Sequence, residues 1–189
     1  RLGTFNLHGS LLPHYRGAAP LNWAVINGDT ESGVSTFLLQ HQIDTGNIIF
    51  QEKVEIGPDE TVGDLHDKLM VIGSELVVRT VDELAEGIVK LIPQDKFIAD
   101  PAKLHAPKIF KDDCRINWNN PGSKIHNLIR GLSPYPAAWT DLKGEEVVSI
   151  KIYRSCFEPD GNPPKSGTII SDKKHFLKIA CADGFISIT

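Results

Sequence analysis

An asparagine and a histidine near the start of the chain have the types and the spacing that acyl-transfer chemistry uses. Asn6 and His8 lie in a segment expected to form a strand over residues 3–8, so their side chains share one face, about 7 Å apart along the strand. An Asn amide can donate to a developing oxyanion, and an imidazole can accept or release a proton. Asp44, in a loop between two further expected strands, could hold the imidazole. These residues predict an acyl-transfer site at the carboxyl end of a strand, where open α/β sheets bind ligands.

Two other interpretations of these residues stay open on spacing alone. Asn, His and Asp near turns commonly act as local hydrogen-bond partners of the backbone. Ser10 could instead be the nucleophile of a Ser-His-Asp hydrolase. The surrounding sequence GSLLP lacks the G-x-S-x-G pattern that places a nucleophile on a strand-to-helix turn, and this disfavours the hydrolase.

Apolar periodicity in the first half predicts the α/β elements that would position this site. Two further stretches have the alternation of strands, and two others have helical spacing. The longer helix begins at Thr61, a residue type that caps helices, and we expect an interruption near Gly73. The expected strands cover residues 33–40 and 47–56, and the expected helices cover residues 19–29 and 61–87.

The second half has a different pattern. Prolines at 93, 101 and 107 interrupt both kinds of regular structure, so residues 93–105 are predicted to be a linker between a domain at 1–92 and a domain at 106–189. One helix and several short strands separated by turn signals then predict a small β-rich barrel, cut short at its end. The expected helix covers residues 122–132, and the expected strands cover residues 137–142, 146–154, 166–170, 175–181 and 184–189.

Composition limits the class of protein. Hydrophobic residues make up 41% of the 189 residues and charged residues 23%, as in soluble globular proteins. No apolar run approaches the roughly 18 residues that span a bilayer, so no membrane partner is expected. The three cysteines have no metal-ligand spacing, which favours reduced thiols in the cytoplasm and predicts no metal.

Charge is distributed unevenly along the chain. Residues 1–93 hold 6 Lys and Arg against 13 Asp and Glu, whereas residues 94–189 hold 14 against 11. The excess of positive charge in the second half indicates an anionic partner, although an excess of three is modest.

Three long motifs resemble the folate-dependent formyltransferase family. They are NLHGSLLPHYRGAAPLNWAVINGD, SGVSTFLLQHQIDTGNII and HAPKIFKDDCRINWNNPGSKIHNLIRGLSPYPAAW. Together they span both halves of the chain and the linker. The resemblance implies an α/β fold in which part of a Rossmann-like formyltransferase domain, lacking its first half, is followed by a β-rich barrel resembling an oligonucleotide-binding fold.

The resemblance also assigns roles by motif. Asn6, His8 and Asp44 match the family's catalytic set, and Ser10, Leu11, Leu12 and Pro13 match the loop that lines its folate site. Arg16 and Lys108 are weaker candidates for contacts to the substrate or to tRNA, since each could equally be a solvated side chain.

The family reaction moves a formyl group from N10 of 10-formyltetrahydrofolate to an amine, without a metal. The motifs are most similar to the branch whose acceptor is the methionine of initiator tRNA, which acts as a cytoplasmic monomer in translation initiation. Formyltransferases for glycinamide ribonucleotide lack the barrel, and this disfavours them. Sugar-nucleotide formyltransferases, formyltetrahydrofolate hydrolases or dehydrogenases, and a catalytically idle RNA-binding fragment remain alternatives.

Overall fold

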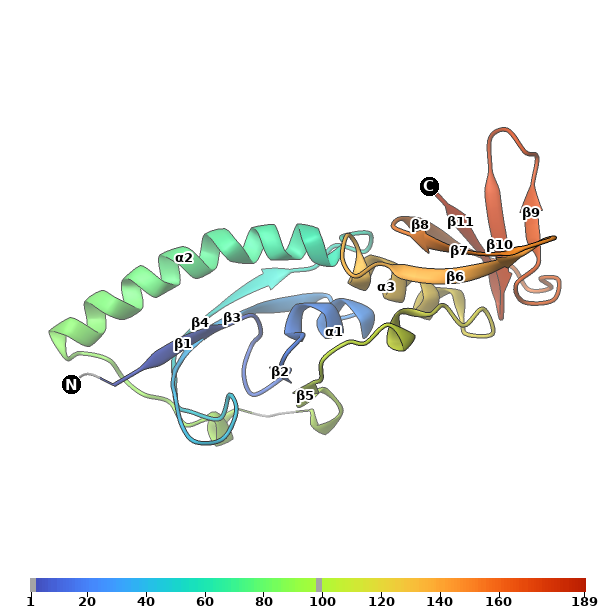
Figure 1. Cartoon of the computed structure of the whole chain (residues 1–189). Coiled ribbons are helices and arrows are strands. Elements are labelled where there is room, and N and C mark those ends of the chain that lie inside the picture. Colours follow the sequence, from blue (N-terminus) through green and yellow to red (C-terminus); the bar gives the residue numbers. More distant parts are fainter. Residues whose placement is uncertain (1–2, 98–99) are drawn as a thin grey trace. The chain divides into compact units, whose positions relative to one another are not determined.

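The computed structural model describes residues 3–97 and 100–189 (Figure 1). The chain divides into two compact units. The first comprises Arg1–Ala24, Asp29–Gly57 and Asp64–Lys108, and the second comprises Val25–Gly28, Pro58–Gly63 and Ile109–Thr189. Each unit is described by itself below.

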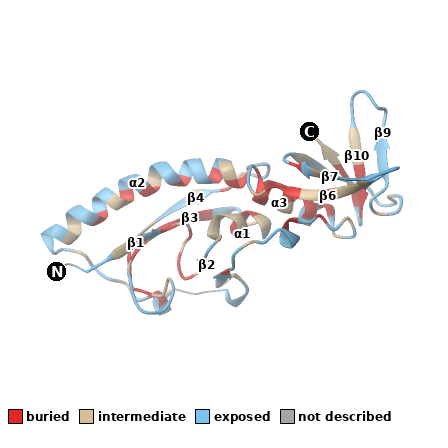
Figure 2. Ribbon diagram, in the orientation of Figure 1, coloured by how far each residue is buried: buried red, intermediate tan, exposed pale blue. Residues whose placement is uncertain are grey.

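A three-stranded antiparallel sheet forms the centre of the first unit. Its strands are β1 (Phe5–His8), β3 (Glu31–Leu38) and β4 (Ile48–Glu55), in the order β1-β3-β4. Because β3 is the middle strand, six consecutive residues of it are buried, and Figure 2 shows this concentration of buried residues. Register places His8 opposite Ser35, so the predicted catalytic strand ends against a buried polar residue of β3.

Two helices occur in the same part of the sequence as these strands. They are α1 (Pro20–Ile26) and α2 (Val62–Glu86), which begins directly after Thr61 as the sequence predicts. The prediction of an interruption near Gly73 is wrong, because α2 continues through this residue. A Cβ at this position would lie 2.9 Å from Cδ2 of Leu7, so the glycine allows close packing between α2 and β1 rather than ending the helix.

The proline-rich segment is hydrogen-bonded within the first unit. It contains two 3₁₀ turns, η1 (Gln94–Lys96) and η2 (Pro101–Lys103), and it leads into β5 (His105–Ala106), which pairs in parallel with β2 (Arg16–Gly17). Residues 98 and 99 of the expected linker lie outside the described residues. The domain boundaries at residues 92 and 106 stay a prediction.

The second unit is β-rich, which confirms the predicted change of architecture. Helix α3 covers the predicted residues 122–132, and the strands form a four-stranded sheet in the order β8-β11-β10-β9 and a β6-β7 hairpin. Strand β8 was not predicted. The bounds are η3 (Asp112–Cys114), α3 (Gly122–Leu132), β6 (Ala138–Lys143), β7 (Val147–Ile152), β8 (Ser155–Pro159), β9 (Ile169–Ser171), β10 (Leu177–Cys181) and β11 (Gly184–Ile188).

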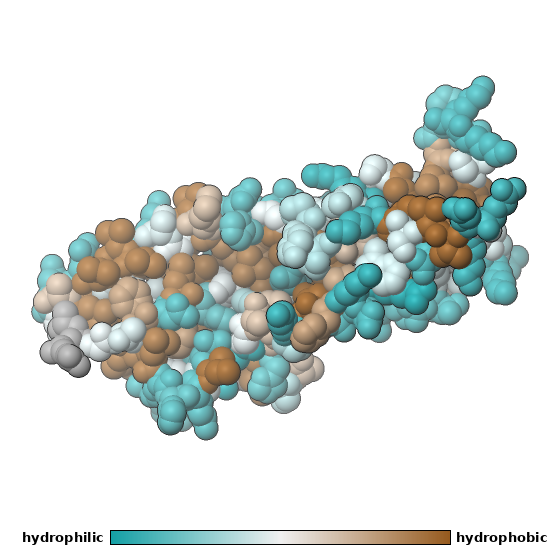
Figure 3. Space-filling model, in the orientation of Figure 1, coloured by the Kyte–Doolittle hydropathy of each residue, from teal (hydrophilic) through white to brown (hydrophobic). Residues whose placement is uncertain are grey.

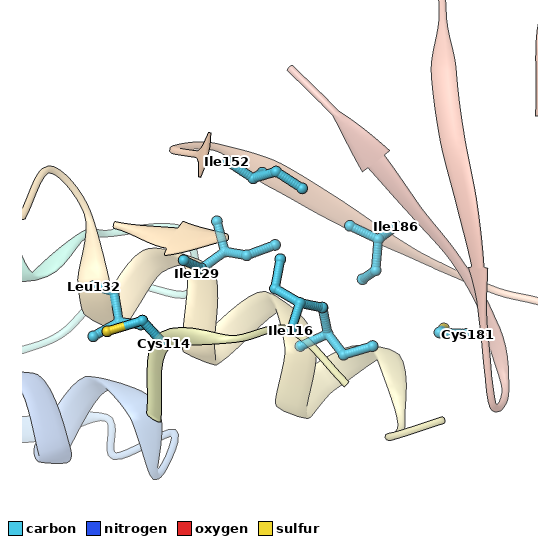
Figure 4. Packing of buried hydrophobic residues seen from close by; sticks show 9 residues of the cluster. Cys114, Ile116, Ile129, Leu132, Ile152, Cys181 and Ile186 are labelled. Atoms are coloured by element: carbon cyan, nitrogen blue, oxygen red, sulfur yellow. The ribbon is translucent and has the colours of Figure 1, made fainter. Parts of the chain in front are cut away.

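An apolar cluster between α3 and these strands forms the core of the second unit (Figure 4). Burial raises the pKa values of the Cys114 and Cys181 thiols, so both cysteines act here as small apolar side chains. The cluster consists of Cys114, Ile116, Ile125, Ile129, Leu132, Ala138, Ile152, Cys181 and Ile186.

Outside this core, the turn between β9 and β10 is strongly hydrophilic (Figure 3).

Truncation of this core should unfold the second unit more easily. Ile129 is fully buried, so Ile129→Ala should lower the free energy of unfolding by about 2–5 kcal/mol. Val147 is 65% exposed on β7, and Val147→Ala should change it by less than about 0.5 kcal/mol. Urea denaturation followed by tryptophan fluorescence measures both variants, and equal losses would refute this placement of the core.

Candidate active site

His8 lies at the end of β1 with its imidazole held from two sides. Its side chain is buried, and Nε2 lies 2.8 Å from the backbone carbonyl of Tyr15. A carbonyl can only accept, so Nε2 carries a proton, and in the neutral ring the lone pair is then on Nδ1. Nδ1 faces the carboxylate of Asp44, with 3.7 Å between Nδ1 and Oδ2. A proton that reaches Nδ1 therefore lies beside a negative charge.

The carbonyl that fixes this tautomer belongs to a constrained residue. Tyr15 is buried and has a φ of 59°, in the left-handed region that non-glycine residues rarely adopt. Its N–H donates to the carbonyl of Lys103 at 2.7 Å, and its hydroxyl donates to Oδ2 of Asp29, also at 2.7 Å. These contacts hold the backbone that orients the His8 ring.

Asp44 is positioned by the backbone of β2. The N–H of Gly17 donates to Oδ2 of Asp44 at 2.9 Å. Gly17 has a φ of 123°, and a Cβ there would lie 2.6 Å from the carbonyl oxygen of Ala106, so only glycine fits beside β5. The sequence showed Gly17 only as part of a loop, because the pairing that requires a glycine joins segments far apart in the chain.

A second buried contact holds the loop of Asp44. Nε2 of Gln94 donates to the carbonyls of Asp44 and Gly46, each at 2.8 Å, while its Oε1 accepts from Nε and Nη2 of Arg16 at 3.1 and 2.6 Å. Sequence reasoning missed Gln94, since a single polar residue in a proline-rich segment has no periodicity or motif. Arg16, expected at a substrate contact, is bound to Gln94.

Asn6 is exposed on β1, two residues before His8. Within the described part of the chain its side chain makes no hydrogen bond, so its amide is open to a ligand. The structure thus brings His8 and Asp44 together and leaves Asn6 facing outward on the same strand. Lys108 is also exposed, at the end of the first unit.

The loop after β1 is held by polar side chains of β3 and β4. Ser35 Oγ donates to the carbonyl of Ser10 at 2.6 Å and accepts from the N–H of Leu12 at 3.1 Å. Nε2 of Gln51 donates to the carbonyl of Leu12 at 2.9 Å and to Ser35 Oγ at 2.8 Å. Ser10 is fully buried and donates its own hydroxyl to the carbonyl of His14 rather than to His8, which argues against its use as a nucleophile.

Three of the four residues expected at a folate site line one pocket of the first unit. Leu11, Leu12 and Pro13 border a cavity of about 540 Å³, whereas Ser10 is fully buried and is not among the lining residues. A pocket of mixed apolar and polar walls is typical of small-molecule sites. The remaining lining residues are His14, Glu31, Gln51, Glu52, Lys53 and Phe97.

Over residues 3–97 and 100–189, no group of three or more His, Cys, Asp or Glu side chains is arranged to hold a metal ion. No helix in those same ranges has the length and apolar character needed to cross a bilayer.

Comparison with known families places the chain in one class. Residues 1–81 match the family model described as formyl transferase, and residues 108–189 match the model described as formyl transferase, C-terminal domain. The chain belongs to the formyltransferase family, which confirms the resemblance of its motifs.

Relatives give a finer comparison. The chain is 53% identical to methionyl-tRNA formyltransferase of Bacteroides fragilis over 100% of its own length and 59% of the relative's. It is 52% identical to the enzyme of the same name from Bacteroides thetaiotaomicron over the same shares, and 48% identical to that of Porphyromonas gingivalis, over 99% of the chain and 59% of the relative. The chain therefore spans about three-fifths of the length of these relatives.

Solved structures share the fold at lower identity. An N-formyltransferase from Helicobacter canadensis, in complex with folinic acid and dTDP-3-aminofucose, has a TM-score of 0.72 and 23% identity over 98% of this chain and 65% of that one. HypX from Aquifex aeolicus, in complex with tetrahydrofolic acid, has a TM-score of 0.68 and 19% identity over 98% of this chain and 31% of that one. These matches confirm the predicted fold class.

Removal of the Ser35 hydroxyl should destabilise the first unit. Ser35→Ala leaves the N–H of Leu12 without its acceptor in a buried position, so the free energy of unfolding should fall by about 1–3 kcal/mol. Ser74 donates to the carbonyl of Val71 on the exposed surface of α2, and Ser74→Ala should cost less than about 0.5 kcal/mol. Chemical denaturation distinguishes the two, and an unchanged Ser35→Ala variant would show that the loop is not held in this way.

Proposed function

We propose that the chain is part of an enzyme that transfers a formyl group from 10-formyltetrahydrofolate to the amino group of methionyl initiator tRNA. The observation that carries the proposal is the buried imidazole of His8, with Nδ1 3.7 Å from the Asp44 carboxylate, on the strand that presents Asn6. The identity of about half the residues with proteins named methionyl-tRNA formyltransferase supports this acceptor. We further propose that the enzyme is a monomer acting in the cytoplasm in translation initiation.

The geometry supports a mechanism of amine attack on the formyl carbon. A bond forms between the amine nitrogen and this carbon, and the carbonyl electron pair moves to oxygen. The exposed amide of Asn6 donates to that oxyanion, and Nδ1 of His8 takes the amine proton. Asp44 stabilises the imidazolium. The electron pair on the oxyanion then re-forms the carbonyl as the carbon–N10 bond breaks. The bonding electrons go to N10 of the folate, which receives the proton from His8, so no metal is needed.

The pocket beside His8's loop is the proposed place for the donor. Leu11, Leu12 and Pro13 would pack against the folate, with Ser10 and Ser35 holding the loop beneath them. Lys108 is proposed to contact tRNA phosphate, because it is an exposed cation. Arg16 remains a candidate for a substrate contact, although its bonds to Gln94 favour a supporting role.

The direct test is a formyl-transfer assay with a protein of the same length as the relatives, called the full-length protein below. The assay contains 10-formyltetrahydrofolate and, in parallel reactions, one of three acceptors. Charged initiator tRNA should be formylated, and free methionine and a nucleotide-sugar amine should not. Formylation of the sugar amine alone would assign the other acceptor class, and release of formate without an acceptor would indicate a hydrolase.

Substitution of the three proposed catalytic residues should remove turnover without unfolding the protein. Asn6→Ala, His8→Ala and Asp44→Asn should each lower kcat by about 100-fold or more, because each removes a group that acts on charge in the transition state. His66 is exposed on α2, and His66→Ala should leave kcat unchanged. Steady-state formylation measures all four, and near-normal turnover of the three would exclude this catalytic set.

Binding of tRNA should depend strongly on salt. The second half has an excess of three positive charges, and Lys and Arg replace condensed counterions on nucleic acids. With about three phosphate contacts, the affinity of the isolated residues 106–189 for tRNA should fall about 40-fold from 50 to 200 mM salt. Phosphate contacts carry no sequence information, so these residues alone should bind initiator and elongator tRNAs similarly, and discrimination of the initiator should come from the first domain. A salt titration with both tRNAs measures this, and a flat dependence would contradict phosphate binding.

A further inference from the structure

One buried amide satisfies four polar groups around the loop of Asp44. Gln94 is 6% exposed, and its two N–H groups are both used, by the carbonyls of Asp44 and Gly46. Its oxygen accepts twice from Arg16. A glutamine side chain has two donors and two acceptor lone pairs, so its hydrogen-bonding capacity is filled. Each of these bonds joins Gln94 to a residue at least 48 positions away in the sequence.

The loop that Gln94 holds is conformationally restricted. Asp44 has a φ of 54°, in the left-handed region that costs a non-glycine residue of order 1 kcal/mol. Two residues later, a Cβ on Gly46 would overlap the carbonyl of Leu38, so the chain turns there with no space for a side chain. Such a backbone persists only where its surroundings hold it, and the two bonds from Gln94 bind the carbonyls on either side of Thr45.

The same amide connects the loop to the strand that holds the carboxylate. Arg16 and Gly17 form β2, and the N–H of Gly17 donates to Oδ2 of Asp44. Gln94 thus fixes the backbone of Asp44 directly and, through Arg16, the strand that binds its side chain. One hydrogen-bond network therefore holds both the backbone and the carboxylate of Asp44.

We propose that Gln94, bound to Arg16, is a positioning residue for formyl transfer, which sets the Asp44 carboxylate beside Nδ1 of His8. The inference rests on the proposed function and adds two residues to it. Gln94 binds the loop backbone and not the reacting groups, so it acts only through Asp44. A displacement of about 1 Å at a reacting group can cost about 100-fold in rate, which is why such support matters.

The substitution Gln94→Glu tests this role with little change in shape. The carboxylate can still accept from Arg16. It cannot donate to the carbonyls of Asp44 and Gly46, because an oxygen replaces the NH₂ group that binds both of them in the wild type. Gln94→Met keeps the length of the side chain, removes the hydrogen bonds and adds no charge. Gln42 is exposed in the same loop, so Gln42→Glu is a control that adds the same charge near Asp44 without breaking these bonds.

In the full-length protein, Gln94→Glu and Gln94→Met should each lower kcat by about 10-fold to 100-fold, while KM for charged tRNA changes less than about threefold. Gln42→Glu should match the wild type. In an Asp44→Asn background, Gln94→Met should cause no further loss, because residues that act through one group are not additive. The melting temperature of each variant shows whether it is folded at the assay temperature.

Three results would overturn the inference. They are unchanged kcat in folded Gln94→Met, an equal loss of kcat with Asp44 present or replaced, and a loss confined to KM. If Gln94→Glu fails to fold, Gln94→Met and Arg16→Lys, which removes the two-pronged donor, provide the same readouts. Failure of the proposed function looks different, because the wild type then formylates no tRNA. An active wild type with an inactive Asp44→Asn variant and unaffected Gln94 variants rejects the positioning role alone.

Discussion

The carboxylate of Asp44 and the imidazole of His8 must stay close together in a largely buried position, and this constraint governs the surrounding structure. Burial of a charged or polar group is unfavourable unless its atoms have partners. The carbonyl of Tyr15 binds one ring nitrogen, and the N–H of Gly17 binds one carboxylate oxygen. Each partner is a backbone group, so the conformation of the chain after β1 determines the geometry of the pair.

The loops around this pair lack a regular backbone ladder, and polar side chains supply hydrogen-bond partners for their backbone groups. Ser35 and Gln51, from β3 and β4, satisfy the loop after His8, and Gln94 satisfies the loop that contains Asp44. A buried amide or hydroxyl with all its bonds formed restricts a loop to one conformation, whereas an unsatisfied one would destabilise it. Specific hydrogen bonds therefore hold the two loops of the site.

Much of the fold could be predicted from local pattern, and the exceptions have a common physical origin. Helix α3 follows from its apolar spacing, and α2 follows from its cap at Thr61. Strand β8 was missed because its pairing with β11 joins residues about 30 positions apart, a contact without a local signal. The spacing of Asn6 and His8 pointed to the site, but the Tyr15 carbonyl and Gln94 carry no sequence signature, since their roles depend on tertiary contacts.

The segment that follows the first family match belongs to the same compact unit as the three proposed catalytic residues. The family model for the first domain ends at residue 81, and the three proposed catalytic residues all precede it. Yet Gln94 binds the Asp44 loop, and β5 pairs with β2 beside the glycine whose N–H holds the carboxylate. Ala106 approaches so closely that position 17 accepts only glycine. Because β5 packs against that glycine and Gln94 binds the loop, the geometry of residues 8 and 44 depends on Gln94 and on His105–Ala106. These residues are far from residues 8 and 44 in the sequence, and only their tertiary contacts connect them to the site.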